Sequence, residues 1–503
     1  MIAGDLFATC RHITLPDSLG SVDVTDVVED SREATPGSIF IARNGSAEHG
    51  SHYAKDAIQR GAALVLTDAD ADISCEAPVV RSPDVKRDGA ILAERFHGDP
   101  SRSLRVMTVT GTNGKTTVAH LIQQFVRLCG GSCGLLGTVH VDDGRVVTPA
   151  RLTTPGAVEV SRTLARMVTN GCECVAMEAS SHALDQGRLA GLAIDVAVFT
   201  NLSGDHLDYH GTMGQYAAAK ASLFAALDAS GVAIVNADDA AWRDMVKSTK
   251  GQVVRCTVQS AEAEARIVEQ SSSIDGAQLH LSGPFGDLRG VCHLPGAHNQ
   301  MNLLQAVCSA NAAGVDVSKL NQRLHELTAP PGRLERVTVD TGAVGPVVLV
   351  DYAHTDDALA SALRAVRPLV PGGGRLWVVF GCGGDRDAKK RPRMGAVASS
   401  LADRIVITSD NPRSEAPGAI IEAIARGIDA SLRENVVEEA DRAKAIHHAI
   451  HEAKESDLIL IAGKGHEDYQ VVSNGAGGTV RRDFDDRKVA RQALQDRMAA
   501  AVS

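Results

Sequence analysis

A short glycine loop between a strand pattern and a helix pattern constrains this chain more than any other stretch. The loop reads Gly111-Thr-Asn-Gly-Lys-Thr-Thr117. Residues 106–110 before it are rich in β-branched side chains, and apolar residues recur at helical spacing over 118–129. A strand, a glycine turn and a helix start direct backbone N–H groups and the positive end of the helix dipole towards an anion. The pattern therefore predicts a phosphate-binding loop in an α/β domain.

The residues of this loop favour a nucleoside triphosphate. Lys115 would hold the outer phosphates, and the hydroxyl of Thr116 would ligate Mg²⁺. The loop has the form G-x-x-G-K-T, shorter than the usual G-x-x-x-x-G-K-[ST], whose first glycine would fall at Val109. We interpret it as an ATP site. The predicted ATP-binding residues of the loop are Gly111, Thr112, Asn113, Gly114, Lys115, Thr116 and Thr117.

Length and composition limit the other possibilities. A chain of 503 residues is too long for one ordinary core, so we expect two or three domains. A formal net charge of −11 excludes a general basic surface for nucleic acid. The sequence has no apolar run near the ~20 residues that span a bilayer and no signal-peptide pattern at its start. The ten cysteines include no C-x-x-C pair, which is typical of reduced thiols in a cytoplasmic protein.

Punctuation along the chain predicts three α/β modules. Residues 96–103 contain Gly, Pro and Ser without periodicity, and Ala329-Pro-Pro-Gly332 follows a segment, 324–327, that we expect to end a helix. The segment 253–288 resembles an antiparallel excursion. The predicted modules are a small N-terminal α/β module over 1–100, a central P-loop ATPase-like, mostly parallel sheet over 101–330, and a C-terminal Rossmann-like module over 331–503.

Polar clusters follow the strand patterns of the central module. The strand patterns cover 174–177, 195–200 and 232–235, and the clusters cover 178–182, 201–210 and 236–239. In an open parallel sheet, ligands bind outside the carboxyl ends of the strands, so we expect these clusters to converge near Lys115. Glu178 and His206 suit a divalent metal there, because one supplies a hard carboxylate and the other an imidazole.

The C-terminal module repeats this arrangement. Its strand patterns over 376–380, 404–408 and 458–462 lead into polar loops over 381–387, 409–413 and 463–467. Arg386 and Arg413 suit a carboxylate-bearing substrate, because guanidinium pairs bidentately with carboxylate. An ATP loop beside such a module favours an activating ligase, in which ATP phosphorylates a carboxylate and an amine attacks the acyl phosphate. The residues alone name neither the acid nor the amine.

Five motifs together resemble those of the Mur ligases, in the family's order and over nearly the whole chain. They are 111–117, Met177-Glu-Ala-Ser-Ser-His182, 201–210, Asp351-Tyr-Ala-His354 and Gly463-Lys-Gly-His-Glu467. Asp410-Asn-Pro-Arg413 resembles the signature of members that add meso-diaminopimelate. The resemblance implies a cytoplasmic, monomeric ligase of peptidoglycan precursor synthesis. It would join meso-diaminopimelate to the D-glutamate γ-carboxylate of UDP-MurNAc-L-Ala-D-Glu through an acyl phosphate, using ATP and Mg²⁺.

The resemblance also implies which residues contact each substrate. The UDP-substrate would contact Ser31, Ser46, Ala47, Glu48, Thr153, Thr154, Ser180, Gln186 and Arg188. Further contacts to ATP would come from Asn299, Arg333 and Asp351. Diaminopimelate would contact Arg386, Asp410, Asn411, Pro412, Arg413, Gly463 and Glu467. The loop 46–48 departs from the family's usual His-Gln-Ala-like pattern, and Asp356 stands where the family usually has proline.

Lys220, four residues after Tyr216, matches the lysine that CO₂ carbamylates in this family. By pattern alone it resembles a surface lysine of a helix. A carbamate converts a cation into a metal-binding anion, so the resemblance implies N6-carboxylysine at this position. The implied Mg²⁺ ligands are Thr116, Glu178, His206 and carbamylated Lys220, and the implied catalytic residues are Lys115, Glu178, His206 and Lys220.

Three alternatives stay open. The chain could be the lysine-adding counterpart or a folylpolyglutamate-synthetase-like ligase, although the N-terminal module argues against the latter, because UDP-sugar recognition needs that extra domain. It could also be a nucleotide-binding switch without ligase chemistry. The predicted carboxylate-binding arginines argue against a switch, because a switch needs no such residues.

Overall fold

The computed structural model describes residues 1–8, 10, 12–45, 48–73, 77–260, 262–273, 276–339 and 345–502. Ser46 and Ala47, two of the predicted UDP-substrate contacts, lie outside the described residues. The chain forms two compact units. The first contains Met1–Arg266, Gly283–Phe285 and Leu304–Lys319, and the second contains Ile267–Ser282, Gly286–Leu303 and Leu320–Ser503. The module boundaries near residues 100 and 330 stay predictions.

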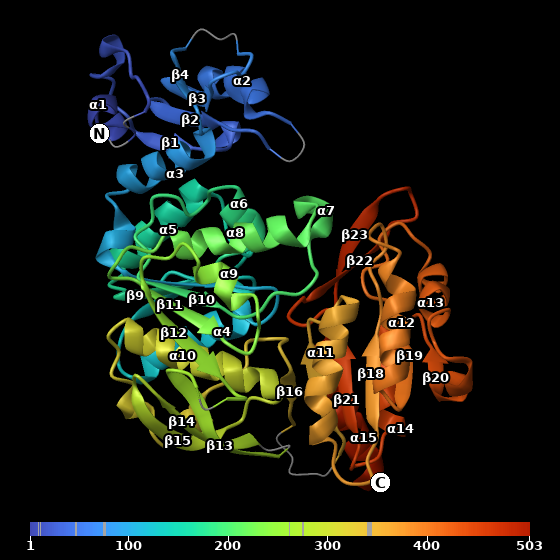
Figure 1. Cartoon of the computed structure of the whole chain (residues 1–503). Helices are drawn as coiled ribbons and strands as arrows, with labels where there is room; N and C mark the ends of the chain where they lie inside the picture. Colours follow the sequence, from blue (N-terminus) through green and yellow to red (C-terminus); the bar gives the residue numbers. More distant parts are fainter. Residues whose placement is uncertain are drawn as a thin grey trace. The chain divides into compact units, whose positions relative to one another are not determined.

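The first unit begins with a small parallel sheet in the order β1-β2-β3-β4 (Figure 1). Its strands are β1 (Asp26–Val28), β2 (Ser38–Ala42), β3 (Leu64–Asp68) and β4 (Val79–Ser82). Ile39 and Ile41 pack with α1 (Ala3–Phe7) and α3 (Val85–Phe96), whereas Phe40 packs with α2 (Ala54–Gln59). Because both faces are covered, the strands are almost wholly apolar. The predicted α/β character of this segment is confirmed.

A buried carboxylate joins this small sheet to the rest of the unit. Glu94 of α3 accepts hydrogen bonds from the backbone N–H of Ser101 at 2.8 Å and from Oγ of Ser161 at 2.8 Å. Ser161 belongs to α5 (Ala157–Thr169), and burial raises the pKa of Glu94. Residues 96–103, which lack a periodic pattern in the sequence, therefore form an ordered junction that ends in a 3-10 turn at Pro100–Ser103.

The larger sheet of the first unit has the order β12-β11-β10-β5-β9-β6-β7-β8. Its strands are β5 (Arg105–Thr110), β6 (Cys133–Leu136), β7 (His140–Asp142), β8 (Val147–Pro149), β9 (Cys174–Glu178), β10 (Val196–Phe199), β11 (Val232–Asn236) and β12 (Gln252–Thr257). Neighbouring strands in this order are parallel, except at one edge, where β7 is antiparallel to both β6 and β8. The predicted strands that end at the phosphate loop and at the polar clusters are confirmed.

The predicted antiparallel excursion is wrong at its start. β12 pairs in parallel with β11, because α9 (Trp242–Val246) carries the chain back across the sheet between them. β13 (Ala265–Ser273) also begins parallel to β12, and β14 (Gly276–Gly283) and β15 (Gly286–Cys292) follow.

Helices cover both faces of this sheet. α5 and α8 (Met213–Ala225) bury Leu164, Leu223 and Phe224 against one face, together with Ala197 and Ala233 of the sheet. Figure 1 shows α4 (Lys115–Leu128) on the opposite side. α6 (Ser181–Asp185) and α7 (Leu207–His210) are short helices that follow β9 and β10.

The second unit is built on a sheet in the order β16-β17-β21-β18-β19-β20. Its strands are β16 (Glu335–Val337), β17 (Val347–Asp351), β18 (Leu376–Phe380), β19 (Arg404–Ile407), β20 (Val436–Glu438) and β21 (Leu458–Ala462). β16 is antiparallel to β17, and the other pairs are parallel. The Rossmann-like alternation is confirmed. The segment 324–327 instead contains a 3-10 turn, Leu324–Glu326, and α10 (Ala297–Ala312) is the preceding α-helix.

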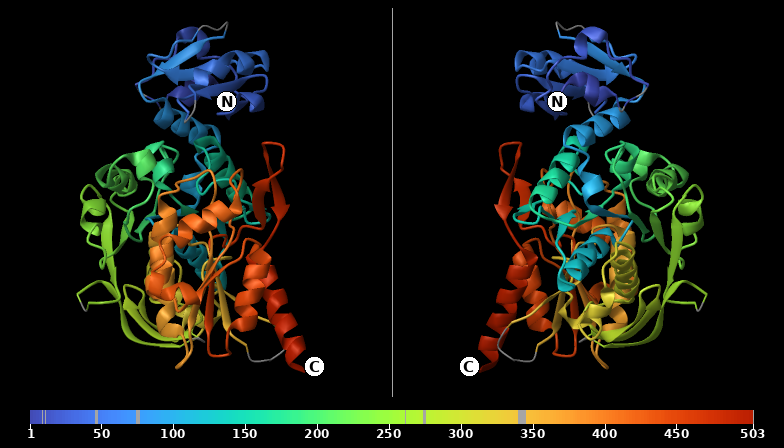
Figure 2. Two further views of the ribbon diagram at one scale, coloured as in Figure 1. Left: turned by 90° about the vertical axis from the view of Figure 1, so that its right-hand side faces the viewer. Right: turned by 90° about the vertical axis from the view of Figure 1, so that its left-hand side faces the viewer.

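Two layers of helices cover this sheet (Figure 2). The helices on one face are α11 (Asp356–Val366), α12 (Lys390–Leu401) and α13 (Pro417–Ala425), and those on the other are α14 (Arg442–Glu452) and α15 (Asp486–Val502). An antiparallel hairpin of β22 (Tyr469–Ser473) and β23 (Thr479–Asp483) follows β21. Asp356 is the first residue of α11 behind the Thr355 cap, so its carboxylate lies at the positive end of the helix. Among the described residues, no helix is both long and apolar enough to cross a membrane.

Candidate active site

The phosphate loop lies against the end of the neighbouring strand β10. Gly111 has φ +146°, and a Cβ built on it would lie 1.9 Å from Oγ1 of Thr200. The N–H groups of Thr112 and Asn113 each donate 2.9 Å bonds to Asn201, one to its backbone oxygen and one to its side chain. Glycine is therefore required where the loop passes β10, and the two hydrogen bonds to Asn201 fix the shape of the loop.

Two lysine side chains meet at one backbone oxygen of this loop. Nζ of Lys115 lies 2.9 Å from the carbonyl oxygens of both Gly111 and Thr112, and Nζ of Lys220 lies 2.9 Å from the same oxygen of Gly111. Lys220 is only 1% exposed, so its expected position on a helix surface is wrong. Burial, and secondarily the charge of Lys115, lowers the pKa of Lys220 to about 6.

The ring of Tyr216 completes the pocket around Lys220. Nζ lies 4.2 Å from the ring centroid, one helical turn away on α8, and Oη of Tyr216 lies 3.2 Å from Oγ1 of Thr112. Lys220 therefore has one carbonyl and one aromatic face as partners, and its lowered pKa favours the neutral amine.

Glu178 ends β9 with a buried carboxylate beside the start of α4. It accepts hydrogen bonds from Oγ1 of Thr116 at 3.0 Å and from both the N–H and the hydroxyl of Thr138, at 2.7 and 3.0 Å. The direct contact between Thr116 and Glu178 pairs two hard oxygen donors of the kind that Mg²⁺ prefers. Within the described parts of the chain, no group of three or more His, Cys, Asp or Glu is arranged to hold a metal ion.

His206 lies in a cluster of imidazole and phenol rings. Its backbone has φ +54°, and its ring centroid lies 4.8 Å from that of His182 and 6.4 Å from that of Tyr216. Burial is the main cause that lowers the pKa of His206, and the charges of Lys115 and Lys220 add to it. These effects favour the neutral imidazole, the form that binds metals. The structure thus brings Lys115, Lys220 and His206 into one electrostatic environment.

Five of the predicted contacts to the UDP-substrate lie in the region around Glu178. Oγ1 of Thr154 donates to the carbonyl of Glu178 at 2.7 Å and accepts from the N–H of Ser180 at 3.0 Å, while Oγ1 of Thr153 accepts from Thr138 at 3.1 Å. Arg188 donates to the carbonyl of Thr154 at 2.5 Å and to Oε1 of Gln186 at 2.7 Å. These five residues form one polar cluster, called the peptide cluster below: Thr153, Thr154, Ser180, Gln186 and Arg188.

Of the UDP-substrate contacts predicted in the N-terminal module, the structure describes Ser31 and Glu48. Ser31 is buried at the start of a 3-10 turn after β1, and Glu48 is exposed with Oε2 2.8 Å from Oη of Tyr53. Arg43, which precedes the loop, pairs with Glu29 at 3.0 Å, and both charges act on Arg188. The Arg43–Glu29 pair therefore lies near enough to Arg188 to act on its pKa, in opposite directions, and sequence reasoning missed this pair.

In the second unit, Asp351 contacts the segment that carries Arg333, another residue predicted to reach ATP. Its carboxylate accepts hydrogen bonds from the N–H groups of Leu334 and Ala353, both at 2.8 Å, and the Arg333 guanidinium lies 4.7 Å from the ring of Tyr352. Asn299 on α10 is buried and donates to the carbonyl of Pro295 at 2.6 Å. The Asp351 carboxylate is therefore bonded to the residue next to Arg333.

The residues predicted to bind diaminopimelate surround the ends of β19 and β21. Nδ2 of Asn411 donates to Oε2 of Glu467 at 3.0 Å, and Nη1 of Arg413 donates to the carbonyl of Gly384 at 2.7 Å. A Cβ on Gly383 would lie 2.9 Å from Nη1 of Arg413 and 3.7 Å from Cγ of Arg386, so both arginines border that glycine. The full predicted set in this region is Arg386, Asp410, Asn411, Pro412, Arg413, Gly463 and Glu467.

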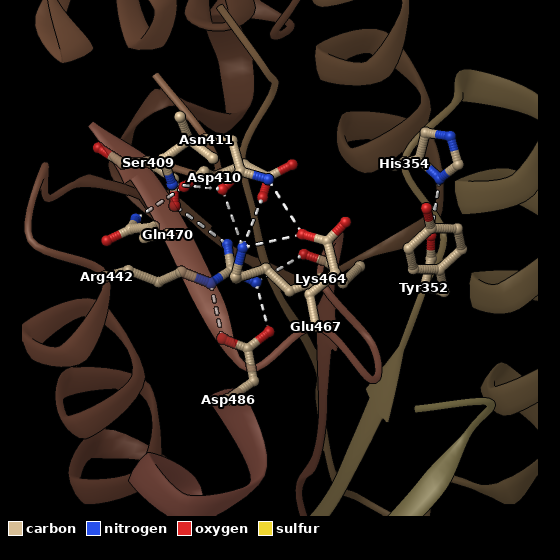
Figure 3. A network of polar contacts seen from close by, with 12 residues as sticks. Tyr352, His354, Ser409, Asp410, Asn411, Arg442, Lys464, Glu467, Gln470 and Asp486 are labelled. Carbon is tan, nitrogen blue, oxygen red and sulfur yellow. Dashed lines mark hydrogen bonds and ion pairs between the residues drawn. The ribbon is translucent and has the colours of Figure 1, made fainter. Parts of the chain in front are cut away.

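Two residues of these sites were missing from the predicted sets. Thr138 follows the apolar strand β6 as Glu178 follows β9, so the strand-end pattern could have found it. Lys464 lies inside a quoted motif, but its fully buried position between Asp410 and Glu467 is visible only in the structure (Figure 3).

Three family models match the chain, one after another. The description "Mur ligase family, catalytic domain" matches residues 23–97, "Mur ligase middle domain" matches 109–310, and "Mur ligase, glutamate ligase domain" matches 332–465. The matches agree with a fold of three successive α/β domains.

Named proteins align with nearly the whole chain. A UDP-N-acetylmuramoyl-L-alanyl-D-glutamate–2,6-diaminopimelate ligase of Geobacillus kaustophilus (strain HTA426) is 42% identical over 485 residues, which are 95% of this chain and 96% of the relative. A solved structure of a ligase with this name is 34% identical with a TM-score of 0.71, covering 98% of this chain and 99% of that one. A Mycobacterium tuberculosis folylpolyglutamate synthase complexed with ADP and AMPPCP, at 19% identity and TM-score 0.59, covers 74% of this chain and 91% of its own and shows a shared fold alone.

Proposed function

This chain belongs to the Mur ligase family, and from that membership we propose that it joins meso-diaminopimelate to the D-glutamate γ-carboxylate of UDP-MurNAc-L-Ala-D-Glu. ATP is converted to ADP and phosphate. The observation that carries the choice of amine is the Asp410-Asn-Pro-Arg413 loop, whose Asn411 is hydrogen-bonded to Glu467. The relative from Geobacillus kaustophilus bears the name of this activity.

The reaction has two displacements. An oxygen of the γ-carboxylate attacks the γ-phosphorus of ATP, the bond to the bridging oxygen breaks, and ADP leaves. The amine of diaminopimelate then attacks the acyl carbon, phosphate leaves with the electron pair of the acyl–oxygen bond, and the nitrogen loses a proton. Lys115 and the loop N–H groups would hold the phosphates in place, since phosphoryl transfer depends mainly on positioning and charge neutralisation.

We assign the Mg²⁺ site to Thr116, Glu178, His206 and carbamylated Lys220. A bound Mg²⁺ would supply positive charge beside the phosphate oxygens. The contact between Thr116 and Glu178 supports this assignment, and the carbamate adds the anionic oxygens that the side chains alone lack. Carbamylation forms a bond between Nζ of Lys220 and the carbon of CO₂ with loss of a proton, and it requires the neutral amine that burial favours.

The remaining predicted contacts belong to the UDP-substrate and to ATP. The peptide cluster of Thr153, Thr154, Ser180, Gln186 and Arg188 would hold the substrate's carboxylate-bearing peptide, and Ser31 with loop 46–48 would hold the uridine diphosphate. Asn299, Arg333 and Asp351 would contact ATP. The cytoplasmic location and the monomeric state stay predictions.

Release of ADP in the presence of the UDP-muramoyl dipeptide tests the function directly. We expect release with meso-diaminopimelate and little with L-lysine, because lysine lacks the distal carboxylate that Arg413 would bind. Preferred turnover of L-lysine would assign the lysine-adding counterpart. Stabilisation by folate but not by UDP in a thermal-shift experiment would favour a folylpolyglutamate synthetase, and ATP hydrolysis independent of any amine would favour a switch.

Arg413→Ala is expected to raise the KM for diaminopimelate roughly tenfold or more, because a hydrogen bond to a charged group contributes ~1.5–3 kcal/mol. The KM for ATP should change less than about twofold, since the change removes no contact to phosphate. Steady-state kinetics with each substrate varied in turn measure both constants. Arg426→Ala, an exposed arginine on the same unit paired with Glu422, is the control. Equal increases in both constants would contradict the assigned role.

A further inference from the structure

Lys464 is a fully buried cation in the region assigned to the amino-acid substrate. Its Nζ lies 3.1 Å from Oε2 of Glu467, 3.2 Å from Oδ1 of Asn411 and 3.5 Å from Oδ1 of Asp410 (Figure 3). A buried ammonium is strongly unfavourable unless its three donors find partners. Here the partners are the side chains proposed to meet diaminopimelate.

The lysine joins two segments that are distant in the sequence. Asp410 and Asn411 follow β19, whereas Glu467 lies in the turn after β21. Nδ2 of Asn411 donates to the same Glu467 oxygen, at 3.0 Å, that Lys464 contacts. The direction of the Glu467 carboxylate is therefore fixed by two donors, and Lys464 is the charged one.

The β22–β23 hairpin holds the other side of the same loop. Nε2 of the buried Gln470 donates to the carbonyl of Asp410 at 2.7 Å, and the N–H of Val471 donates to Oδ1 of Asn411 at 2.9 Å. The N–H of Arg413 donates to the carbonyl of Val471 at 3.0 Å, at a position with φ +53°. Oδ1 of Asn411 thus accepts from both Val471 and Lys464, which sets the orientation of its amide.

A separate ion pair supports the strand ends beneath this network. The fully buried Arg442 forms two 2.7 Å hydrogen bonds with Asp486 and donates to the carbonyls of Ser409 and Ala462, at 3.2 and 2.9 Å. Arg442 therefore secures β19 and β21 without Lys464. Loss of the lysine should change the side chains above these strand ends more than the sheet itself.

We propose that Lys464 is a positioning residue for the amino-acid substrate, acting through Glu467 and Asn411. This role rests on the proposed function. Two carboxylates, Asp410 and Glu467, repel each other in a buried site, and the ammonium of Lys464 holds both while leaving one net negative charge. Such a site suits an incoming substrate that carries ammonium groups, and it keeps Glu467 from turning away before the substrate arrives.

Lys464→Met is expected to raise the KM for diaminopimelate roughly tenfold or more, because Glu467 loses its charged partner. The KM values for ATP and for the UDP-muramoyl dipeptide should stay within about twofold. Lys464→Arg keeps the charge and should recover most of the affinity. Lys444→Met, an exposed lysine of α14, is the matched control and should change none of the three constants.

A double-mutant cycle separates positioning from a structural role. If Lys464 acts through Glu467, then Lys464→Met should have a much smaller effect on the diaminopimelate KM in the Glu467→Gln background than in the wild type. Independent effects that simply multiply, or equal increases in the KM for ATP, would overturn the proposal. Should the methionine variant fail to fold, Lys464→Gln replaces it in the same cycle, with the same expectation.

The wild-type protein distinguishes the two levels of failure. If it releases no ADP with diaminopimelate, the proposed function is wrong before any variant is compared. If it turns over diaminopimelate and the Lys464 variants keep the wild-type KM for it, only the positioning role is wrong.

Discussion

Lys115→Ala is expected to lower the rate of diaminopimelate-dependent ADP release by roughly 10²–10³-fold, the range found when one preorganised electrostatic donor is removed from an active site. In the structure Lys115 lies across its own loop, bonded to the carbonyls of Gly111 and Thr112, so its ammonium is already at the place where phosphates would bind. Single-turnover measurement of ADP at saturating ATP reports the rate itself. A rate near that of the wild type would place the ATP site elsewhere.

A control variant and a stability measurement make this test specific. Lys250→Ala removes an exposed lysine of the same unit and should leave the rate unchanged. The N–H groups of Thr112 and Asn113 also anchor the loop to Asn201, independently of Lys115, so thermal unfolding of the variant should remain close to that of the wild type. Strong destabilisation would mean that the lost rate reflects unfolding.

Lys220→Met is expected to abolish the ligase activity and yet stabilise the folded protein. Folding lowers the pKa of Lys220 from 10.5 to about 6, mainly through burial. Between these two values the unfolded chain binds one more proton at this site than the folded chain does. The free energy of unfolding of the wild type therefore rises with pH across this window, and the cost of burying Lys220 is largest below it. Methionine removes the titration and should add on the order of 2–4 kcal/mol near pH 7.5.

Urea unfolding at several pH values in CO₂-depleted buffer measures this effect, because a carbamate would change the charge of the native state. The difference between variant and wild type should shrink as pH rises towards 10. Lys247→Met, an exposed lysine, should give no such pH-dependent difference. In buffer with ¹³C-labelled bicarbonate, a carbamate carbon signal should occur in the wild type and vanish in Lys220→Met. Its absence from both would remove the carbamate from the metal site.

The part of the site around the phosphate loop could be predicted from the sequence, because the patterns that reveal it are local. The glycine loop lies between β5 and α4, and Glu178 and the 201–210 cluster directly follow β9 and β10. Parallel strands bring their carboxyl ends together, so local patterns determined a non-local arrangement. The same reasoning gave Asp410–Arg413 and Glu467 at the ends of β19 and β21.

Burial at Lys220 could not be predicted in the same way. α8 contains a run of alanines around Lys220, so small side chains occur on every side and no polar face contrasts with an apolar one. The buried position becomes visible only when Tyr216 and the phosphate loop are placed beside it. Lys464 is similar, because its partners Asp410 and Asn411 lie more than fifty residues earlier in the chain. The parallel course of β12 was missed because α9 is too short to give a clear helical period.

The left-handed backbone of Arg413 limits how amino-acid selectivity can be transferred between ligases. A non-glycine residue at φ +53° is unfavourable by itself, and here it is bonded to Val471 of the hairpin. A tetrapeptide Asp-Asn-Pro-Arg grafted alone into a relative would relax to another shape. The segment to transfer should run from Gly383 to Asp486, because it then carries the signature, the glycines beside Arg413, the buried lysine, the hairpin and both members of the buried Arg442–Asp486 pair.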